Sequence, residues 1–183
     1  MMKVKSLLAV SALFAGFVGS AGAPAQEMMF GTEADAGYAA LLWSAMVEKN
    51  LAGPDAVHSS LAEGTEPHGL FEVFYASADI DGHTGDLVVK RNYGAVELTE
   101  DEVASDFDGH LRGITVMFRR EDGYDADNKN WFWTMFMPDG TIGKNEMGMQ
   151  LAGRVAKGMD VGCLACHTAA DGGDYIFTSN AIK

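Results

Sequence analysis

Two cysteines and a histidine near the C-terminus are the residues best placed to do chemistry in this chain. Cys163 and Cys166 are three positions apart, His167 follows directly, and the sequence contains no other cysteine. Two thiols about one helical turn apart can each form a thioether with one vinyl group of a single haem, and the adjacent imidazole can then bind the iron. The C-x-x-C-H pattern therefore predicts one covalently bound haem c per chain. Cys163 and Cys166 would attach it, and His167 would be the metal ligand.

A redox dithiol, half of a zinc site and a disulfide are the other interpretations of the two cysteines. The N-terminus favours haem, because it has the pattern of a secretory signal. Two lysines precede an apolar run at residues 7–18, which is short for a membrane span, and an Ala-Pro-Ala sequence follows at 23–25. We predict a signal peptide at residues 1–25 and a single periplasmic haem domain at 26–183, with an uncleaved N-terminal anchor as the alternative. Covalent haem attachment takes place in the bacterial periplasm.

The charge of the chain limits its partners. The sequence of 183 residues has a formal net charge of −13 at pH 7. So acidic a chain is expected to bind neither nucleic acid nor an anionic lipid surface. It could attract a basic, soluble redox protein. A chain of this length can also bury a substantial hydrophobic core.

The segments expected to position the motif are one helix and several strands. Thr32 and Asp35 predict the start of a helix, and the apolar periodicity that follows ends before the Gly-Pro pair at 53–54. Four later runs are rich in β-branched and aromatic residues, as is typical of strands: 70–76, 86–92, 114–119 and 130–137. We therefore predict an α+β fold. It would be mainly an antiparallel β-sheet with flanking helices, with the haem held between the sheet and the C-terminal C-x-x-C-H segment.

The last of these strands has two apolar faces, which indicates a central position in the sheet. Trp131, Trp133, Met135 and Met137 would share one face, and Phe132, Thr134 and Phe136 the other. The loop at 121–129 does not match a calcium-binding loop and is predicted to be a solvated turn. Leu151 and Val155 predict a short helix leading to the haem motif.

The position of the motif affects the second axial ligand. No methionine follows His167, so a methionine ligand would have to come from upstream, where Met147 and Met149 are candidates. The interpretation we favour is a five-coordinate haem with an open distal face, which could bind or transform small molecules.

The order of several short motifs resembles the cytochrome P-460 family over about residues 70–178. The matching segments are Asp86-Leu87-Val88-Val89-Lys90, Asn92-Tyr93-Gly94, Gly123-Tyr124-Asp125, Asn130-Trp131-Phe132-Trp133, Pro138-Asp139-Gly140, the haem motif and Asp174-Tyr175-Ile176-Phe177-Thr178. The four-helix cytochrome c′ also carries its haem motif near the C-terminus, but the four strand-like runs do not fit a helix bundle.

The resemblance implies a special role for Lys90. In cytochrome P-460 a lysine on the corresponding strand is bonded to the porphyrin edge, which suits the haem to oxidise hydroxylamine, with nitrous oxide or nitric oxide as product. The relatives called cytochrome c′-beta lack this bond and bind nitric oxide in a distal pocket walled by phenylalanine. From the residues alone, Lys90 shares a face with Val88 and could instead extend into water. An enzyme, a nitric-oxide-binding protein and an electron carrier all stay open. The family also implies a homodimer.

The resemblance further places Phe71 and Phe74 on a strand that lines the distal side. Phe74 stands where cytochrome P-460 has a polar, basic residue, which favours the nitric-oxide-binding relatives. Hydroxylamine chemistry also needs a base to take protons from the substrate. Asp160 is our first choice among the acids, because it lies three residues before Cys163. Further candidates are His68, His110, Asp106 and Asp108.

Overall fold

The computed structural model describes residues 30–64, 68–94, 98–155, 157, 162–170 and 174–177. The predicted signal peptide at 1–25 and the predicted base Asp160 lie outside the described residues. Within the described part of the chain, no helix is both long and apolar enough to cross a membrane.

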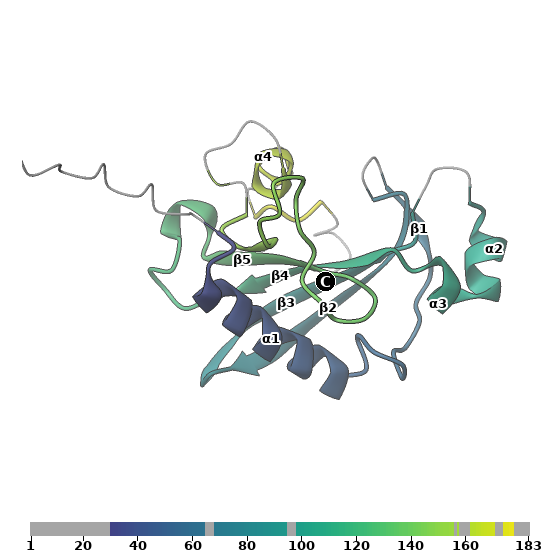
Figure 1. Ribbon diagram of the computed structural model, residues 1–183, viewed down its shortest axis with the longest axis horizontal. Helices are drawn as coiled ribbons and strands as arrows, with labels where there is room; N and C mark the ends of the chain where they lie inside the picture. Colours follow the sequence, from purple (N-terminus) through teal and green to yellow (C-terminus); the bar gives the residue numbers. More distant parts are fainter. Residues whose placement is uncertain are drawn as a thin grey trace, which may run out of the picture.

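A six-stranded antiparallel sheet forms the centre of the molecule, and each strand pairs with its neighbours in sequence (Figure 1). The strands are β1 (Ala62–Glu63), β2 (Leu70–Ile80), β3 (His83–Asn92), β4 (Gly113–Arg119), β5 (Trp131–Phe136) and β6 (Ala152–Gly153). The helices are α1 (Glu33–Glu48), α2 (Glu100–Ser105), α3 (Phe107–His110), α4 (Cys163–His167) and the 3-10 helix η1 (Ala126–Asn128). The predicted α+β, mainly antiparallel fold is confirmed.

Helix α1 begins where the sequence predicts. The Thr32 hydroxyl accepts a hydrogen bond from the Asp35 backbone N–H, and the Asp35 carboxylate accepts one from the Thr32 backbone N–H, each at 3.1 Å. These reciprocal bonds satisfy backbone donors that an uncapped helix would leave free. Leu42 and Met46 are fully buried against the sheet, whereas Leu41 is largely exposed, so the buried stripe is narrower than the apolar periodicity suggested.

The β2–β3 hairpin is longer than predicted at its turn end. Ile80 pairs with His83 across the two-residue turn Asp81–Gly82, whose φ angles are 54° and 78°. Positive φ at both central residues is the geometry of a type I′ turn, which matches the twist of the flanking strands. Polar residues alternate with small ones beyond Ala76, and this weak apolar signal is why the sequence analysis ended the strand too early.

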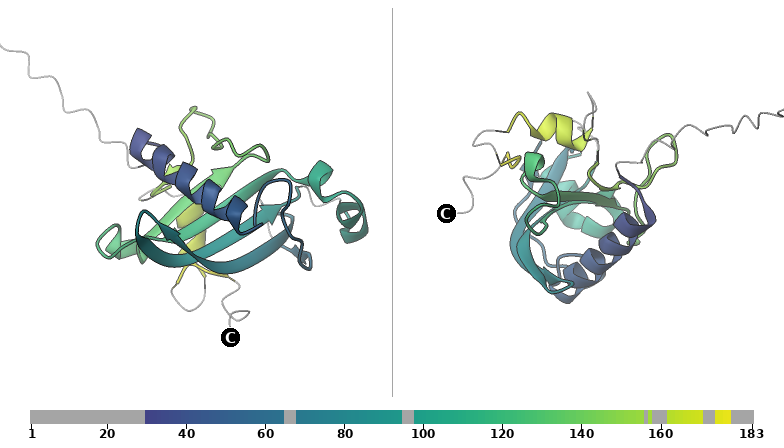
Figure 2. Two further views of the ribbon diagram at one scale, coloured as in Figure 1. Left: turned by 90° about the horizontal axis from the view of Figure 1, so that it is seen from below. Right: turned by 90° about the vertical axis from the view of Figure 1, so that its left-hand side faces the viewer.

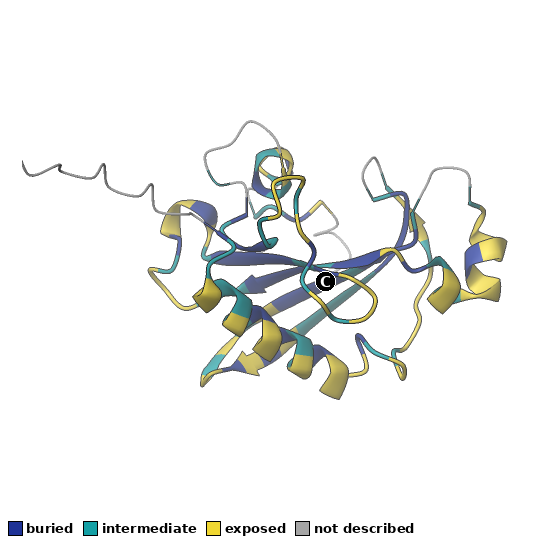
Figure 3. Ribbon diagram, viewed as in Figure 1, coloured by how far each residue is buried: buried dark blue, intermediate teal, exposed yellow. Residues whose placement is uncertain are grey.

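The sheet has two faces with different covers, shown by Figures 1 and 2. We call them the α1 face and the α4 face. The α1 face packs against α1 and includes the buried residues Leu87, Val89, Val116, Phe118, Phe132 and Phe136. The α4 face packs against the C-terminal segments and includes the buried residues Val88, Met117, Trp131, Trp133, Leu164 and Ile176. The predicted alternation along β5 is confirmed for its buried aromatic residues. Figure 3 shows that the outer side of α1 is exposed while the middle of the sheet is buried.

One prediction about a connecting segment was wrong. The helix expected around Leu151 and Val155 is replaced by β6, in which Gly153 has φ 103° and pairs with Trp133. Backbone pairing with β5 decided this outcome rather than local composition. The loop at 121–129 is mostly exposed, as predicted, although Asp125 is buried and forms an ion pair with Lys157.

Candidate haem site

Helix α4 carries the C-x-x-C-H residues over the α4 face of the sheet (Figure 1). Leu164 is buried in the apolar cluster on the α4 face, and its packing there holds this short helix against the sheet. Both thiols are free: Cys163 is partly buried, and Cys166 is exposed. Burial raises the pKa of the Cys163 thiol, which keeps it protonated. The two thiols that the sequence predicts as attachment points thus lie on one helical turn, directly before His167.

The imidazole of His167 is held in one orientation. Its Nδ1–H donates to the Tyr175 backbone carbonyl at 2.6 Å, which leaves the lone pair on Nε2 for a metal. The rings of Trp133 and Phe177 lie against it, with centroids 5.0 and 5.2 Å away. Burial lowers the pKa of His167 and Lys90 lowers it further, while the hydrogen bond to Tyr175 acts in the opposite direction. The imidazole is therefore neutral, as a metal ligand must be.

The segment that holds His167 is docked on the sheet by an arginine and a tryptophan. Arg119 Nη2 donates to both carboxylate oxygens of Asp174 at 3.0 Å. The indole N–H of Trp131 donates to the Asp174 carbonyl at 3.2 Å, and the Arg119 guanidinium stacks on the Trp131 ring. The sequence analysis missed this role of Arg119 and Trp131. Asp174-Tyr175, quoted there as a motif, was the available signal.

Lys90 lies on the α4 face, on the side of β3 that the strand alternation predicted. Its neighbours across the sheet are Val73 on β2 and Thr115 on β4. The Lys90 Nζ lies 4.4 Å from the centroid of the Phe71 ring, so the predicted site residue Phe71 is on this face too. Burial lowers the pKa of Lys90 to about 8. The amine therefore loses its proton more readily than an ordinary lysine, although it is mostly protonated at pH 7.

Phe74 lies on the opposite face, which contradicts its predicted role as a lining residue. It pairs with Val89 and packs against the α1 face. Phe71 and Phe74 are three positions apart on one strand, so strand alternation sends their side chains to opposite faces. The argument that Phe74 favours nitric-oxide-binding relatives is thereby lost.

Among the predicted bases that lie in the described part of the chain, His68 is the one beside His167. The centroids of the two rings are 6.3 Å apart and the ring planes are perpendicular. His68 Nδ1 is 3.0 Å from Asn92 Oδ1. The Asn92 amide nitrogen faces the carbonyls of Lys90 and Gly113, which can only accept, so the Asn92 oxygen faces His68. His68 Nδ1 therefore donates, and its Nε2 carries the free lone pair.

The environment also keeps His68 neutral. Burial lowers its pKa and the nearby charge of Lys90 lowers it further, while the hydrogen bond to Asn92 acts in the opposite direction. Sequence reasoning had named His68 only as one of several bases, and Asn92 only as part of a motif.

Of the other predicted bases and methionine ligands in the described part of the chain, only Met149 lies on the α4 face. Asp106 caps α3 through the Gly109 N–H, and His110 bonds to the Asp106 carbonyl, so both are engaged locally. Asp108 is exposed. Met147 is 71% exposed, whereas Met149 packs against the α4 face.

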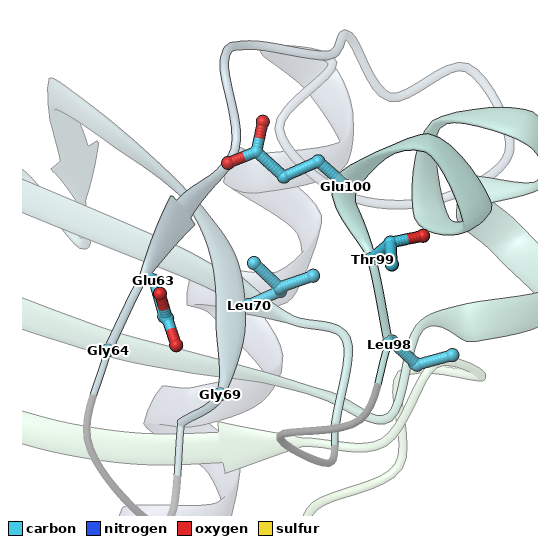
Figure 4. A pocket seen from close by; sticks show the side chains of 7 residues that line it. All are labelled: Glu63, Gly64, Gly69, Leu70, Leu98, Thr99 and Glu100. Carbon is cyan, nitrogen blue, oxygen red and sulfur yellow. The ribbon is translucent and has the colours of Figure 1, made fainter.

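A hollow of about 220 Å³ lies between the β1–β2 hairpin and the start of α2 (Figure 4). Its lining contains the carboxylates of Glu63 and Glu100 and the apolar side chains of Leu70 and Leu98. Its described lining residues include no cysteine or histidine. This hollow is therefore separate from the residues that could hold a haem.

The residues on the α4 face fit a haem c. Two free thiols precede a neutral imidazole with an available Nε2, and the surface beneath them is apolar and aromatic. The buried indole N–H of Trp133 has no hydrogen-bond partner among the described residues, so a group that accepts hydrogen bonds is missing beside His167. In the same part of the chain, no cluster of three or more His, Cys, Asp or Glu side chains is arranged to hold a metal ion.

Comparison with known proteins supports this interpretation at the level of the family. No curated protein and no solved structure matches the chain. A family model described as Cytochrome P460 matches residues 75–178, which is more than half of the sequence and includes Lys90 and the C-x-x-C-H motif. This match implies a haem cofactor and supports a c-type cytochrome. The chain belongs to the cytochrome P460 family.

Proposed function

We propose that this cytochrome is a periplasmic enzyme that oxidises hydroxylamine to nitrogen oxides at a lysine-linked haem. One haem c per chain would be attached through Cys163 and Cys166, with His167 as an axial ligand and Lys90 as a third covalent link. When bound, the haem supplies an iron that changes oxidation state and accepts small ligands on the side opposite His167. The haem would lie between the sheet and α4.

The position of the Lys90 amine is the observation that carries the proposal. It lies on the same face as Val88, is partly buried, and has no carboxylate partner among the described residues. A lysine that simply extended into water would keep the usual pKa of an ammonium. The lowered pKa of Lys90, about 8, gives the amine a larger neutral fraction than an ordinary lysine has, and the neutral form can act as a nucleophile.

The cysteine and lysine links differ in their redox requirement. Each thiol would add across a vinyl group, so that its sulfur and its hydrogen both end on the former double bond and no oxidant is needed. The Lys90 link replaces one N–H and one C–H bond with an N–C bond. Two protons and two electrons are released, so this link needs an oxidant such as dioxygen or peroxide.

The reaction itself needs an acceptor for protons and an acceptor for electrons. Oxidation of hydroxylamine to nitric oxide releases three of each. The electrons would pass to a soluble redox protein, and the net charge of −13 favours a basic one. The protons need a base, for which Asp160 stays our prediction.

Peptide mapping of the mature protein tests the proposal. We expect one haem-bearing tryptic species that contains both Lys90 and the Cys163–Cys166 segment. Hydroxylamine should turn over in the presence of an electron acceptor, and Lys90→Leu should lose this turnover. An unmodified Lys90 peptide in fully haem-loaded protein would contradict the proposal.

A non-enzymatic nitric-oxide-binding protein is the second candidate function. The contact between Phe71 and Lys90 favours it, because an aromatic side chain then stands on the α4 face beside the amine. Such a protein would have an unlinked Lys90 and would bind nitric oxide without consuming hydroxylamine. The family resemblance also leads us to propose a homodimer, which sedimentation of the holoprotein would test.

A further inference from the structure

We infer that His68 is the second axial ligand of the haem iron in the resting protein, on the side opposite His167, and that a small substrate must displace it. This inference rests on the proposed haem site and concerns its regulation. It replaces the permanently open distal face expected from the sequence with a face that is closed until a ligand competes.

The distance between the two imidazole rings carries the inference. An imidazole nitrogen binds a first-row metal at about 2 Å, which places the centres of two rings on opposite sides of one metal about 6 Å apart. The centroids of His68 and His167 are 6.3 Å apart. Had His68 been positioned as a base acting on an iron-bound molecule, the rings would need to be roughly 3 Å farther apart. Their perpendicular planes also fit, because two perpendicular planes can share one axis through the iron.

The hydrogen bonds of the two histidines are matched. Each Nδ1–H donates to an amide oxygen, from the Tyr175 backbone in one case and from the Asn92 side chain in the other. A ligating histidine commonly donates its second N–H to such an acceptor, which fixes the tautomer and directs the other nitrogen to the metal. Both histidines therefore offer a free Nε2.

Asn92 is itself fixed by three partners. The two hydrogens of its amide nitrogen face three acceptors at 3.2 to 3.3 Å, namely the Lys90 carbonyl, the Gly113 carbonyl and the Thr115 hydroxyl. The acceptor for His68 is thus anchored in the β3–β4 ladder. A base on a solvent-exposed loop would not need such an anchor.

The place of His68 in the chain would allow its release. It stands before the first residue of β2 and is followed by Gly69, whose φ is 58°. The side chain can therefore leave the iron without breaking a strand pair of the main sheet. Its release would break the hydrogen bond to Asn92. The apparent affinity for a small ligand would then depend directly on how often His68 occupies the iron, because the ligand can bind only to molecules in which His68 is released.

Spectroscopy of the purified ferric holoprotein tests the inference. We expect a low-spin electron paramagnetic resonance signal, and a near-infrared magnetic circular dichroism band typical of two imidazole ligands. His68→Ala should give a high-spin haem, and added imidazole should restore the low-spin spectrum. The substituted protein should bind hydroxylamine or nitric oxide about tenfold faster or more. His110→Ala is the matched control and should leave all of these properties unchanged, because His110 is only partly buried and bonds to the backbone carbonyl of Asp106, the N-cap residue of its own helix.

Two results would overturn the inference. One is a high-spin wild-type haem, and the other is a low-spin haem that persists in His68→Ala without imidazole, which would direct attention to Met149. If His68→Ala is not produced with haem, the wild-type near-infrared band still separates two imidazoles from an imidazole and a thioether. A two-imidazole haem with an unmodified Lys90 would uphold the inference and reject the proposed enzyme. A high-spin haem linked to Lys90 would do the reverse.

Discussion

The two faces of the sheet are built from alternate residues of the same strands, yet they differ in how their buried charges are paired. On the α1 face, Arg91 is buried beside the buried Glu72, with 3.5 Å between Nη1 and a carboxylate oxygen, and Tyr93 also donates to Glu72. On the α4 face, the neighbouring residue Lys90 has only the Phe71 ring as a charge-stabilising contact among the described residues.

The segments that cover the two faces also differ in length. A helix of 16 residues closes the α1 face, whereas α4 has five residues and is supplemented by the segment at 174–177. A partly buried ammonium without a carboxylate partner is costly, so folding alone does not account for Lys90 on the α4 face. The comparison teaches that the α1 face serves stability and that the α4 face is arranged for a ligand.

The largest expected effect comes from removing both thiols on the α4 face. Cys163→Ala combined with Cys166→Ala should abolish haem-linked peroxidase staining at the monomer position of a denaturing gel, because no thioether can form. Lys90 is the remaining possible link, so the triple substitution with Lys90→Leu serves as the control. Stain that persists in the triple variant would refute attachment at these residues.

On the α1 face, Arg91→Met should lower the free energy of unfolding by about 3 to 5 kcal/mol, because it leaves the buried Glu72 carboxylate without its cation. Urea unfolding measures the change. Adding Glu72→Gln should recover part of the loss. Equal stability of the single variant and the wild type would mean that the two faces do not differ as described.

Substitution of the adjacent residue, Lys90, should change the free energy of unfolding in the opposite direction. In haem-free protein, Lys90→Met should raise the free energy of unfolding by on the order of 2 kcal/mol at pH 7, because it removes a buried ammonium. Burial lowers the pKa of Lys90 from 10.5 to about 8, so between these values the unfolded chain binds more protons than the folded chain. Wild-type stability should therefore rise with pH across that window. The advantage of Lys90→Met should be complete below pH 8 and vanish above pH 10.5, and a gain independent of pH would contradict this explanation.

The smallest expected effect concerns the docking of the C-terminal segment. Asp174→Asn should cost about 1 kcal/mol or less, since the pair with Arg119 is partly exposed. The spectrum of the ferric haem should nevertheless change, because Asp174 helps to position the carbonyl that orients His167. Asp86→Asn removes the other carboxylate partner of Arg119 and is the control, with a similar cost but no spectral change.

The sequence by itself determined the features that depend on residues close together in the chain. The Thr32–Asp35 capping box set the start of α1. Alternation along β3 placed Lys90 on one face with Val88, and alternation along β5 placed Trp131 on one face with Trp133. The five residues of the haem motif indicated the cofactor, and the order of short motifs indicated the family. The same alternation rule would also have separated Phe71 from Phe74, had the family resemblance not been followed instead.

Only the tertiary structure decided which distant residues meet. His68 lies beside His167 because β2 and α4 converge on one side of the sheet, and Arg119 reaches Asp174 because β4 runs beneath the C-terminal segment. No local pattern encodes these contacts, since they depend on strand register and on how a whole face is covered. For the same reason, the sequence supplied the chemistry of the proximal side, while the candidate for the opposite side of the iron emerged only from the fold.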